Sequence, residues 1–267
     1  MLPAPQIAFL SLSTARDPRA HRAANEWHQL DHRPENLALA GVAWGERFVL
    51  PPAAAADAEA RGSFTDFHYA NLYWLDEPHT ASIQTWADFA EQSHREGRRP
   101  DIDLLDRPYM GFFRLVGTAV SPDSRMSARS LCFRPNTGLL LFVTSVPESW
   151  SRTEVHARNR SELDDVVPAM AAVPGIATVW CLESDPGLAP AEWSSRESAR
   201  GTTEQHRLRV LVAATEIDPA PVVLARLHED HPDVFTALDA LPGRTEFRGA
   251  VETITPWKWD WFDEVHG

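Results

Sequence analysis

Several residue types and motifs are scarce or missing in this chain, and each shortage narrows the functions it could have. There are only two cysteines among 267 residues, Cys132 and Cys181. Both lie inside apolar, strand-like runs and not at metal-ligand spacing, which predicts two buried, reduced thiols. The sequence also has no Gly-rich phosphate loop, no Gly-x-Ser-x-Gly elbow and no Cys-x-x-Cys pair. Nucleotide binding, serine hydrolysis and thiol redox chemistry therefore lack their usual signatures.

Positive charge and long apolar runs are also in short supply. The 25 Lys and Arg residues face 38 Asp and Glu residues, a net charge of −13 that repels phosphate backbones and anionic lipids. Apolar runs such as residues 139–143 are far shorter than the roughly 20 residues that cross a bilayer. The N-terminus lacks the basic and apolar regions of a secretory signal. We therefore expect a cytoplasmic protein that binds neither nucleic acid nor membrane.

What the sequence does contain is 43% hydrophobic residues, enough for a substantial core, in a pattern that repeats halfway along the chain. The first half predicts a strand at 7–13, a helix ending near Arg33 before Pro34, strands at 41–50 and 67–75, a helix around 83–90 and a strand at 110–120. The second half predicts a strand at 139–146, a helix at 154–173, strands at 176–182 and 208–214, a helix at 221–238 and a strand at 245–254. Each half reads β-α-β-β-α-β, with long insertions at 53–62 and 186–205 in corresponding places.

Two glycines mark the repeat most clearly. Gly41 and Gly175 lie 134 residues apart, each at the turn from the first helix to the second strand of its half, where glycine readily adopts positive φ. A β-α-β-β-α-β unit forms an antiparallel sheet with both helices on one face, so its other face needs cover. We therefore predict an α+β fold in which two tandem ferredoxin-like halves, 1–125 and 126–267, pack as a pseudo-dimeric α+β barrel. Two independent domains joined near 122–130 are the alternative.

The end of the first helix carries the most unusual segment, Glu26-Trp27-His28-Gln29-Leu30-Asp31-His32-Arg33-Pro34. It resembles the EthD-like branch of the dimeric α+β barrel proteins. An aromatic residue, a His-x-Pro element and a Pro-Gly-hydrophobic turn follow one another in that family, and here they match Trp27, His32-Arg33-Pro34 and Ala40-Gly41-Val42, with alanine in place of the first proline. Tyr73-Trp74-Leu75-Asp76-Glu77 looks like the family's third strand running into its second helix. The resemblance covers the first half well and the second half in outline.

This resemblance implies that hydrophobic small molecules bind between sheet and helices, with the helix-end histidine as acid or base. Related barrel families include cofactor-free oxygenases, decarboxylases, dehydratases, isomerases and haem enzymes. The candidate catalytic residues are His32, with a reference pKa of about 6.5 that suits proton transfer, and His28 or Asp31 as its assistants. The alternative for His32 is a helix-terminating residue bonded to backbone carbonyls.

The third strand offers candidate ligand contacts. Tyr69, Asn71 and Tyr73 share one face of it and mix rings with polar groups, as ligand-lining surfaces do, although an internally satisfied core would look the same. Weaker candidates are Trp44 and Arg47 on the second predicted strand and Arg114 on the fourth. The full predicted substrate-binding set is Trp27, Trp44, Arg47, Tyr69, Asn71, Tyr73 and Arg114.

A shift of 134 residues places Val166 opposite His32, so the second half lacks this histidine. We therefore expect one pocket, in the first half, with the second half as its built-in partner. This hypothesis fails if His156 or His206 lines an equivalent cavity.

A metal or haem is not expected. His28 and His32 share a helix face with Glu35 one turn further, but Pro34 should end the helix before Glu35 and no nearby cluster supplies a third ligand. Haem would need an axial histidine, and no attachment motif accompanies one.

In the C-terminal tail, Trp257, Trp259 and Trp261 recur at period two, which predicts packing on the barrel or closure of its rim, with a subunit contact or a lid as alternatives.

Together these features predict a cofactor-independent enzyme acting on a hydrophobic, aromatic or polyketide-like small molecule. Decarboxylation, dehydration, isomerisation and oxygenation all stay open, as does a homodimer. The rival hypotheses are a binding or carrier protein without turnover and a structural module with a filled barrel.

Overall fold

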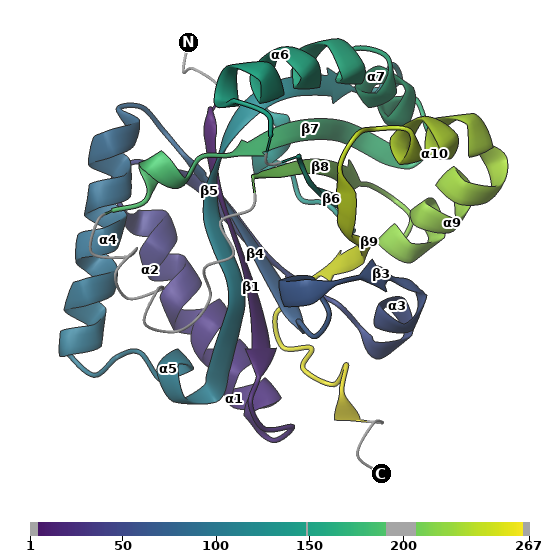
Figure 1. Cartoon of the computed structure of the whole chain (residues 1–267). Helices are drawn as coiled ribbons and strands as arrows, with labels where there is room; N and C mark the ends of the chain where they lie inside the picture. The colour runs from purple at the N-terminus through teal and green to yellow at the C-terminus, as the bar shows by residue number, and fades with distance from the viewer. Residues whose placement is uncertain (1–4, 148, 191–206, 264–267) are drawn as a thin grey trace.

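A computed structural model describes residues 5–147, 149–190 and 207–263 of the chain (Figure 1). Its strands form one sheet in the order β2-β4-β1-β5-β7-β8-β6-β9-β3, and β2 also pairs with β9, which closes the first eight of these into a barrel. The strands of the first half are β1 (Ile7–Ala15), β2 (Val42–Val49), β4 (Tyr69–Leu75) and β5 (Leu105–Val120). Those of the second half are β6 (Gly138–Ser145), β7 (Ile176–Ser184), β8 (Leu208–Thr215) and β9 (Arg244–Thr253). The short β3 (Glu59–Ala60) pairs only with β9.

The two halves have the same topology. In each, the four strands lie in the order second, third, first, fourth, and every pairing is antiparallel. The halves meet through β5–β7 on one side and β2–β9 on the other. The predicted fold of two tandem ferredoxin-like halves packed as a pseudo-dimeric α+β barrel is therefore confirmed. Residue 125 falls between β5 and β6, and a division into two domains there stays a prediction.

Helices cover the outside of the barrel. In Figure 1, α1 (Ala20–Trp27), α2 (Arg33–Ala38) and α4 (His79–Arg95) lie against the first half, joined by the π-helical turn η1 (His28–His32) and the short α5 (Asp101–Leu104). The second half carries α6 (Arg152–Leu163), α7 (Val166–Ala171), α9 (Ala220–Asp230) and α10 (Pro232–Asp239). The connections include α3 (Pro52–Asp57) and the 3-10 turns η2 (Gly62–Phe64), η3 (Leu131–Phe133) and η4 (Pro186–Leu188).

The interior of the barrel is a packed core. Side chains of both halves fill it, as in the pair formed by Trp74 and Trp180, whose ring centroids lie 5.3 Å apart. Leu131 from η3 and Phe64 from η2 join the same core from the connections. The barrel interior is thus filled, as the structural-module hypothesis required, and any ligand site belongs outside it.

The predicted turn glycines are confirmed. Gly41 has φ +90° and Gly175 has φ +95°, and each precedes the second strand of its half. Both of these strands also carry a register shift directly after their first residue, between Val42 and Trp44 and between Ile176 and Thr178. The halves therefore correspond residue by residue along these strands.

Some predicted helix boundaries were wrong. Pro34 does not end the first helix, which continues through α2 to Ala38. The wider turn of η1 just before it relieves the contact between the proline ring and the carbonyl four residues earlier. The helices predicted at 154–173 and 221–238 are each split in two, the second at Pro232, whose ring cannot continue α9. Residues 191–205 of the predicted second insertion lie outside the described residues.

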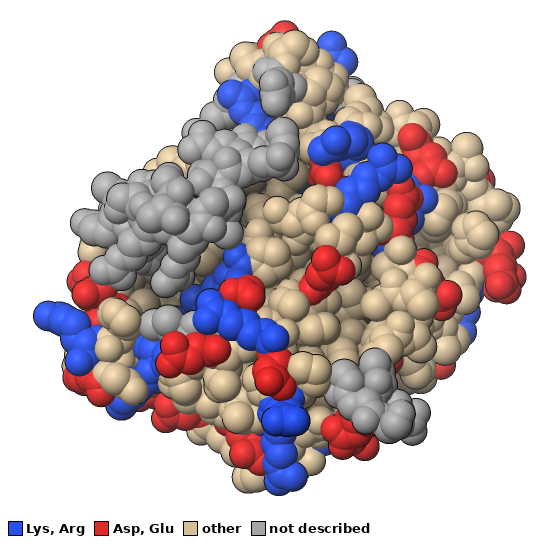
Figure 2. All heavy atoms as spheres, turned by 60° about the horizontal axis from the view of Figure 1, so that its bottom comes forward, with Lys and Arg blue, Asp and Glu red and all other residues tan. Residues whose placement is uncertain are grey.

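The C-terminal tail leaves β9 of the second half and packs on the first half. Trp259 and Phe262 are buried against Val49 and Tyr69, while Trp257 is 73% exposed. On the face shown in Figure 2, basic and acidic side chains are interspersed among uncharged ones. Among the helices of the described residues, none is both long and apolar enough to cross a membrane.

Candidate functional site

The π-helical turn η1 orients the candidate histidines. In it the backbone N–H of Arg33 donates to the carbonyl of His28, five residues back, and such turns are frequent at functional sites. The extra residue turns His28 and His32 toward the sheet, where both are buried, and leaves Asp31 exposed. His28 and His32 therefore lie together inside the first half, whereas the predicted assistant Asp31 lies on its surface.

A hydrogen-bonded network surrounds Arg47 of β2, which is fully buried. Its Nε donates to Oδ1 of Asn71 and its Nη1 to Oδ1 of Asn25, both at 3.1 Å. Asn25 in turn donates to the hydroxyl of Tyr69 at 2.8 Å, and that oxygen lies 2.7 Å from Nδ1 of His21. The guanidinium of Arg47 also lies 5.3 Å from the centre of the Tyr69 ring. One chain of polar groups thus links α1 to the middle of the sheet.

A second group surrounds His32. Its Nε2 lies 3.2 Å from the amide nitrogen of Asn36, which donates to the hydroxyl of Tyr73 at 3.4 Å. The His32 ring stacks on Trp27, with centroids 4.8 Å apart and planes at 13°, and meets the His28 ring edge-on at 5.0 Å. The alternative reading of His32 as a mere helix terminator does not describe this position, because the helix continues past it.

We call the combined set the polar cluster. It comprises Ser11, His21, Asn25, Trp27, His28, Gln29, His32, Asn36, Arg47, Tyr69, Asn71 and Tyr73.

Burial controls the charges in the polar cluster. Removal from water, with the neighbouring charges of Arg47 and His32, holds the pKa of His28 well below 6.5, so His28 is a neutral base at neutral pH. Burial raises the pKa of Tyr69 to about 12 and also raises that of Tyr73, so both stay protonated. Burial lowers the pKa of Arg47 to about 10, which still leaves it a cation. The polar cluster therefore contains a neutral imidazole beside a desolvated positive charge.

Several buried polar atoms of the polar cluster have no hydrogen-bond partner among the described residues. These atoms are Trp27 Nε1, His28 Nδ1, Gln29 Oε1, Asn36 Oδ1 and Arg47 Nη2. Buried polar groups are nearly always paired, because an unpaired one loses its bonds to water without replacement. Because five such atoms gather in one interface, we take the polar cluster as the candidate functional site.

The second half provides an internal comparison. In the first half Asn71 pairs across the sheet with Arg47 and Ser11; in the second, Leu211 pairs in the same way with Cys181 and Phe142. Leu211, Cys181 and Phe142 belong to the apolar core between this sheet and its helices. Val166 and Met170, at a shift of 134 from His32 and Asn36, belong to it as well. The second half thus has apolar residues at the positions of Arg47, Asn71, Ser11, His32 and Asn36, although Arg209, which corresponds to Tyr69, is buried there as well.

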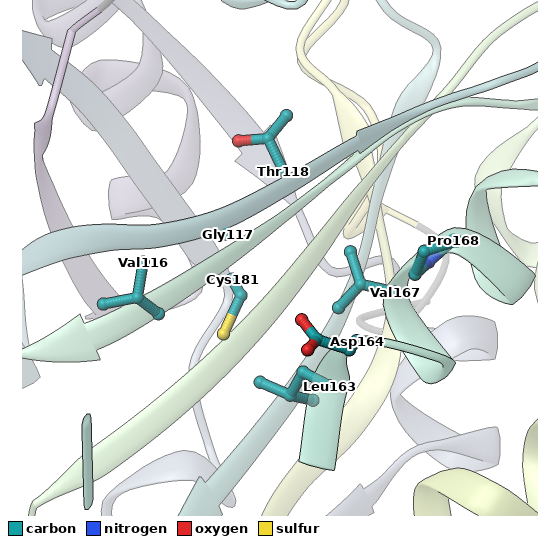
Figure 3. A pocket seen from close by; sticks show the side chains of 8 residues that line it. All are labelled: Val116, Gly117, Thr118, Leu163, Asp164, Val167, Pro168 and Cys181. Carbon is teal, nitrogen blue, oxygen red and sulfur yellow. The ribbon is translucent and has the colours of Figure 1, made fainter. Parts of the chain in front are cut away.

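A small recess lies where β5 of the first half meets β7, α6 and α7 of the second half, beside the position that corresponds to Arg47 (Figure 3). Its volume is about 140 Å³, below the roughly 300 Å³ at which ligand pockets begin. Its lining residues are Val116, Gly117, Thr118, Leu163, Asp164, Val167, Pro168 and Cys181. His156 is not among them and instead lies 3.5 Å from Glu183. His206 lies outside the described residues.

Two predicted contact residues do not join the polar cluster. Trp44 packs toward the barrel core and lies under the guanidinium of Arg33 at 5.5 Å, because the register shift after Val42 turns it to the other face of β2. Arg114 is half-exposed and pairs with Asp185 at 2.6 Å. Trp27, Arg47, Tyr69, Asn71 and Tyr73 do belong to the polar cluster.

Five members of the polar cluster were not among the residues predicted from the sequence. These are Ser11, His21, Asn25, Gln29 and Asn36. A signal was present, since His21, Asn25, Gln29, His32 and Asn36 recur at three- or four-residue spacing, which places them on one helix face. An inward-facing stripe of that kind is ordinarily apolar.

Metal ligation finds little support. Glu35 does lie in the helix after η1, but it pairs with Arg98 at 2.5 Å. Within the described ranges, no group of three His, Cys, Asp or Glu side chains is placed to hold a metal ion.

Comparison with known proteins identifies relatives by structure only. No family model and no curated protein matches the sequence. The barrel recurs in solved structures. An anthrone oxidase-like protein matches with a TM-score of 0.54 and 10% identity over 96% of this chain and 95% of its own. A proposed monooxygenase of Fusobacterium nucleatum matches with a TM-score of 0.54 and 9% identity over 96% of this chain and 94% of its own. The encapsulated DyP-type peroxidase of Mycobacterium smegmatis matches with a TM-score of 0.50 and 13% identity over 98% of this chain and 96% of its own. At these identities the likeness establishes the dimeric α+β barrel fold.

Proposed function

We propose that this protein is a cofactor-independent enzyme that moves a proton on a hydrophobic, aromatic or polyketide-like small molecule. The site is the polar cluster of the first half, residues 1–125, and residues 126–267 act as the partner half that covers the sheet. The observation that carries the proposal is the contrast between the halves: the register positions of Arg47, Asn71 and Ser11 are filled by Cys181, Leu211 and Phe142 in the second half. Folding alone does not require the polar set.

The two histidines supply the proton chemistry. His28 is neutral at neutral pH and its Nδ1 has no hydrogen-bond partner in the part of the chain that the structure describes, so it can accept a proton from an acidic C–H or O–H group. His32, held by Asn36 and stacked on Trp27, lies edge-on to His28 and gives a proton to the departing oxygen, which in an oxygenation leaves as water. Tyr73, whose hydroxyl stays protonated, donates a hydrogen bond that orients the substrate. Burial excludes water from the reacting atoms.

The resemblance to the EthD-like branch and the names of the structural neighbours agree with this class of chemistry. One neighbour is described as anthrone oxidase-like and another as a monooxygenase. We therefore favour oxygenation over decarboxylation, dehydration or isomerisation. Haem does not fit the polar cluster, because His28 and His32 pack against each other and against Trp27 instead of facing an open apolar slot.

Oxygen consumption tests the proposal. With 1,8-dihydroxy-9-anthrone as the probe, the reaction would take up one O2 per molecule, replace the two ring CH2 hydrogens by one carbonyl oxygen and release one water. We expect the purified protein to accelerate O2 uptake, and His28→Gln and His32→Gln to reduce the rate by about 10²-fold or more. His228→Gln, on α9 of the second half, is the matched control and should leave the rate unchanged.

The rival is a binding or carrier protein that uses the same site without turnover. His32→Ala separates the two: an enzyme loses turnover and retains its ligand, whereas a carrier loses only affinity. Native mass spectrometry of the purified chain, together with its absorption spectrum, shows whether an organic ligand, a metal or haem accompanies it. A stoichiometric bound haem would contradict the cofactor-independent reaction.

A further inference from the structure

We propose that the polar cluster contains an anion subsite, in which the guanidinium of Arg47 binds the oxyanion of a planar, apolar small molecule. This inference rests on the proposed function and sharpens it, because it assigns a negative charge to the ligand and gives that charge a named partner.

The positive charge of Arg47 lies among neutral hydrogen-bond partners. Arg47 is 0% exposed, and its side-chain nitrogens donate to the amide oxygens of Asn71 and Asn25, which are neutral. Its other close neighbour is the neutral ring of Tyr69. Nη2, also buried, has no partner among the described residues. A cation taken out of water is strongly unfavourable without a counter-charge.

The carboxylate of the adjacent residue Glu46 is engaged by other groups. Oε2 of Glu46 accepts from Nη2 of Arg33 at 3.0 Å, and its Oε1 accepts the backbone N–H of Arg47 at 3.1 Å. No ion pair joins Glu46 to the Arg47 guanidinium in the described structure. The exposed Asp31 lies on the outer face of η1. Among the residues that the structure describes, the charge of Glu46 therefore favours the Arg47 cation only without direct pairing, and we assign the place of a direct counter-charge to a ligand.

The side chains around the Arg47 guanidinium indicate the shape and polarity of the ligand. The free N–H of Arg47 lies among rings, with Tyr69 beneath its guanidinium and the imidazole of His28 close enough for the Arg47 charge to lower its pKa. A guanidinium matches the planar geometry of a carboxylate or of a conjugated enolate or phenolate. The surrounding rings favour an aromatic body for the rest of the ligand.

A purely structural role for Arg47 is the alternative, and the second half argues against it. Cys181 occupies the corresponding position, is 1% exposed and lies in an apolar core. The fold thus accommodates a small neutral side chain there.

Calorimetric titration with two matched probes tests the inference. The probes are 2-naphthoate and 2-naphthamide, which share shape and differ in charge, each titrated into the full chain at fixed ionic strength. We expect wild-type protein to bind the carboxylate about tenfold or more tightly than the amide, the range expected for a hydrogen bond to a buried charge. Arg47→Met should remove this preference and leave amide affinity within about threefold of wild type.

Two further variants complete the experiment. Arg47→Lys keeps the charge and loses the planar fork, so it should retain part of the preference even if Arg47→Met fails to fold. Arg226→Met, which removes an arginine paired with Asp218 on the far half, should leave both affinities unchanged. Equal affinity of wild-type protein for the two probes, a preference that survives in Arg47→Met, or no binding of either probe would each overturn the anion subsite. Oxygen uptake by the wild-type protein decides the proposed function separately.

Discussion

At the residue scale, the first half carries interactions that work against its own stability. Arg47 is a buried cation with neutral partners, and His28 is a buried base beside it. An apolar residue at either position would cost less folding free energy, and the second half has Cys181 at the position that corresponds to Arg47. Sites that bind or react commonly hold such unfavourable arrangements, and the free energy they cost is recovered when the ligand arrives.

The depressed pKa of His28 predicts a pH-dependent stability. Because the folded state holds this pKa below 6.5, the unfolded chain binds the proton more readily, and stability falls as pH drops below about 6.5. The free energy of unfolding should fall by up to about 1.4 kcal/mol per pH unit in that window. Urea titrations between pH 5.5 and 8 measure this slope. His28→Gln should reduce it, whereas His94→Gln, on the exposed end of α4, should leave it intact. An unchanged slope in His28→Gln would contradict the assignment.

A double-mutant cycle at the pair formed by Arg47 and Asn71 tests the energetic cost of the polar cluster. Asn71→Leu alone removes the acceptor of Arg47 Nε and should destabilise by about 1–3 kcal/mol, because a buried charged donor is left unpaired. Adding Arg47→Met removes that donor, so the double variant should regain most of the loss. Equilibrium unfolding in urea measures Asn71→Leu, Arg47→Met and the double variant. A double variant less stable than Asn71→Leu would show that Arg47 itself stabilises the fold.

At the scale of elements, the helix–strand turns show what sequence could and could not reveal. Gly41 and Gly175 identified the repeat, because a turn that needs positive φ leaves a visible glycine. The π-turn η1 left no comparable mark, and Pro34 was read as a helix end. The alternation of residues along the strand correctly predicted that Tyr69, Asn71 and Tyr73 share one face. No local pattern indicated that this face meets the helices and that the opposite face fills the barrel. That depends on contacts between the halves.

The two glycines provide a matched prediction. Alanine at either position adopts an unfavourable positive φ, which costs about 1–2 kcal/mol. At Gly41 the added methyl would also lie 2.9 Å from Cα and 2.5 Å from Cβ of Ser82, whereas at Gly175 its nearest neighbours are the ends of the Arg226 and Val223 side chains at 3.0 Å. Gly41→Ala should therefore destabilise by at least about 1 kcal/mol more than Gly175→Ala. Thermal melts compare the two, and equal losses would refute the packing argument.

At the scale of the whole molecule, the C-terminal tail binds the second half to the site of the first. Phe262 stacks on His21 with centroids 4.0 Å apart, and His21 lies beside the Tyr69 hydroxyl. Phe262→Ala should destabilise the chain by about 3 kcal/mol and expose this end of the polar cluster to water. Urea titration measures the loss, and Trp257→Ala, which alters an exposed ring of the same tail, is the control with little effect. Equal effects of the two would show that the tail does not anchor there.

The barrel itself predicts that the halves unfold together. Each sheet would expose its apolar barrel face without the other, and the backbone pairings β5–β7 and β2–β9 cross the boundary between them. Tryptophan fluorescence, which reports the ten tryptophans of both halves including Trp74 and Trp180, and far-ultraviolet circular dichroism should therefore give coincident urea transitions. Trp74→Ala removes the ring on the first-half side and should lower the single midpoint by the equivalent of about 3–5 kcal/mol without splitting the transition. Two separated transitions would instead support independent domains. The polar cluster would then be stable without its partner half.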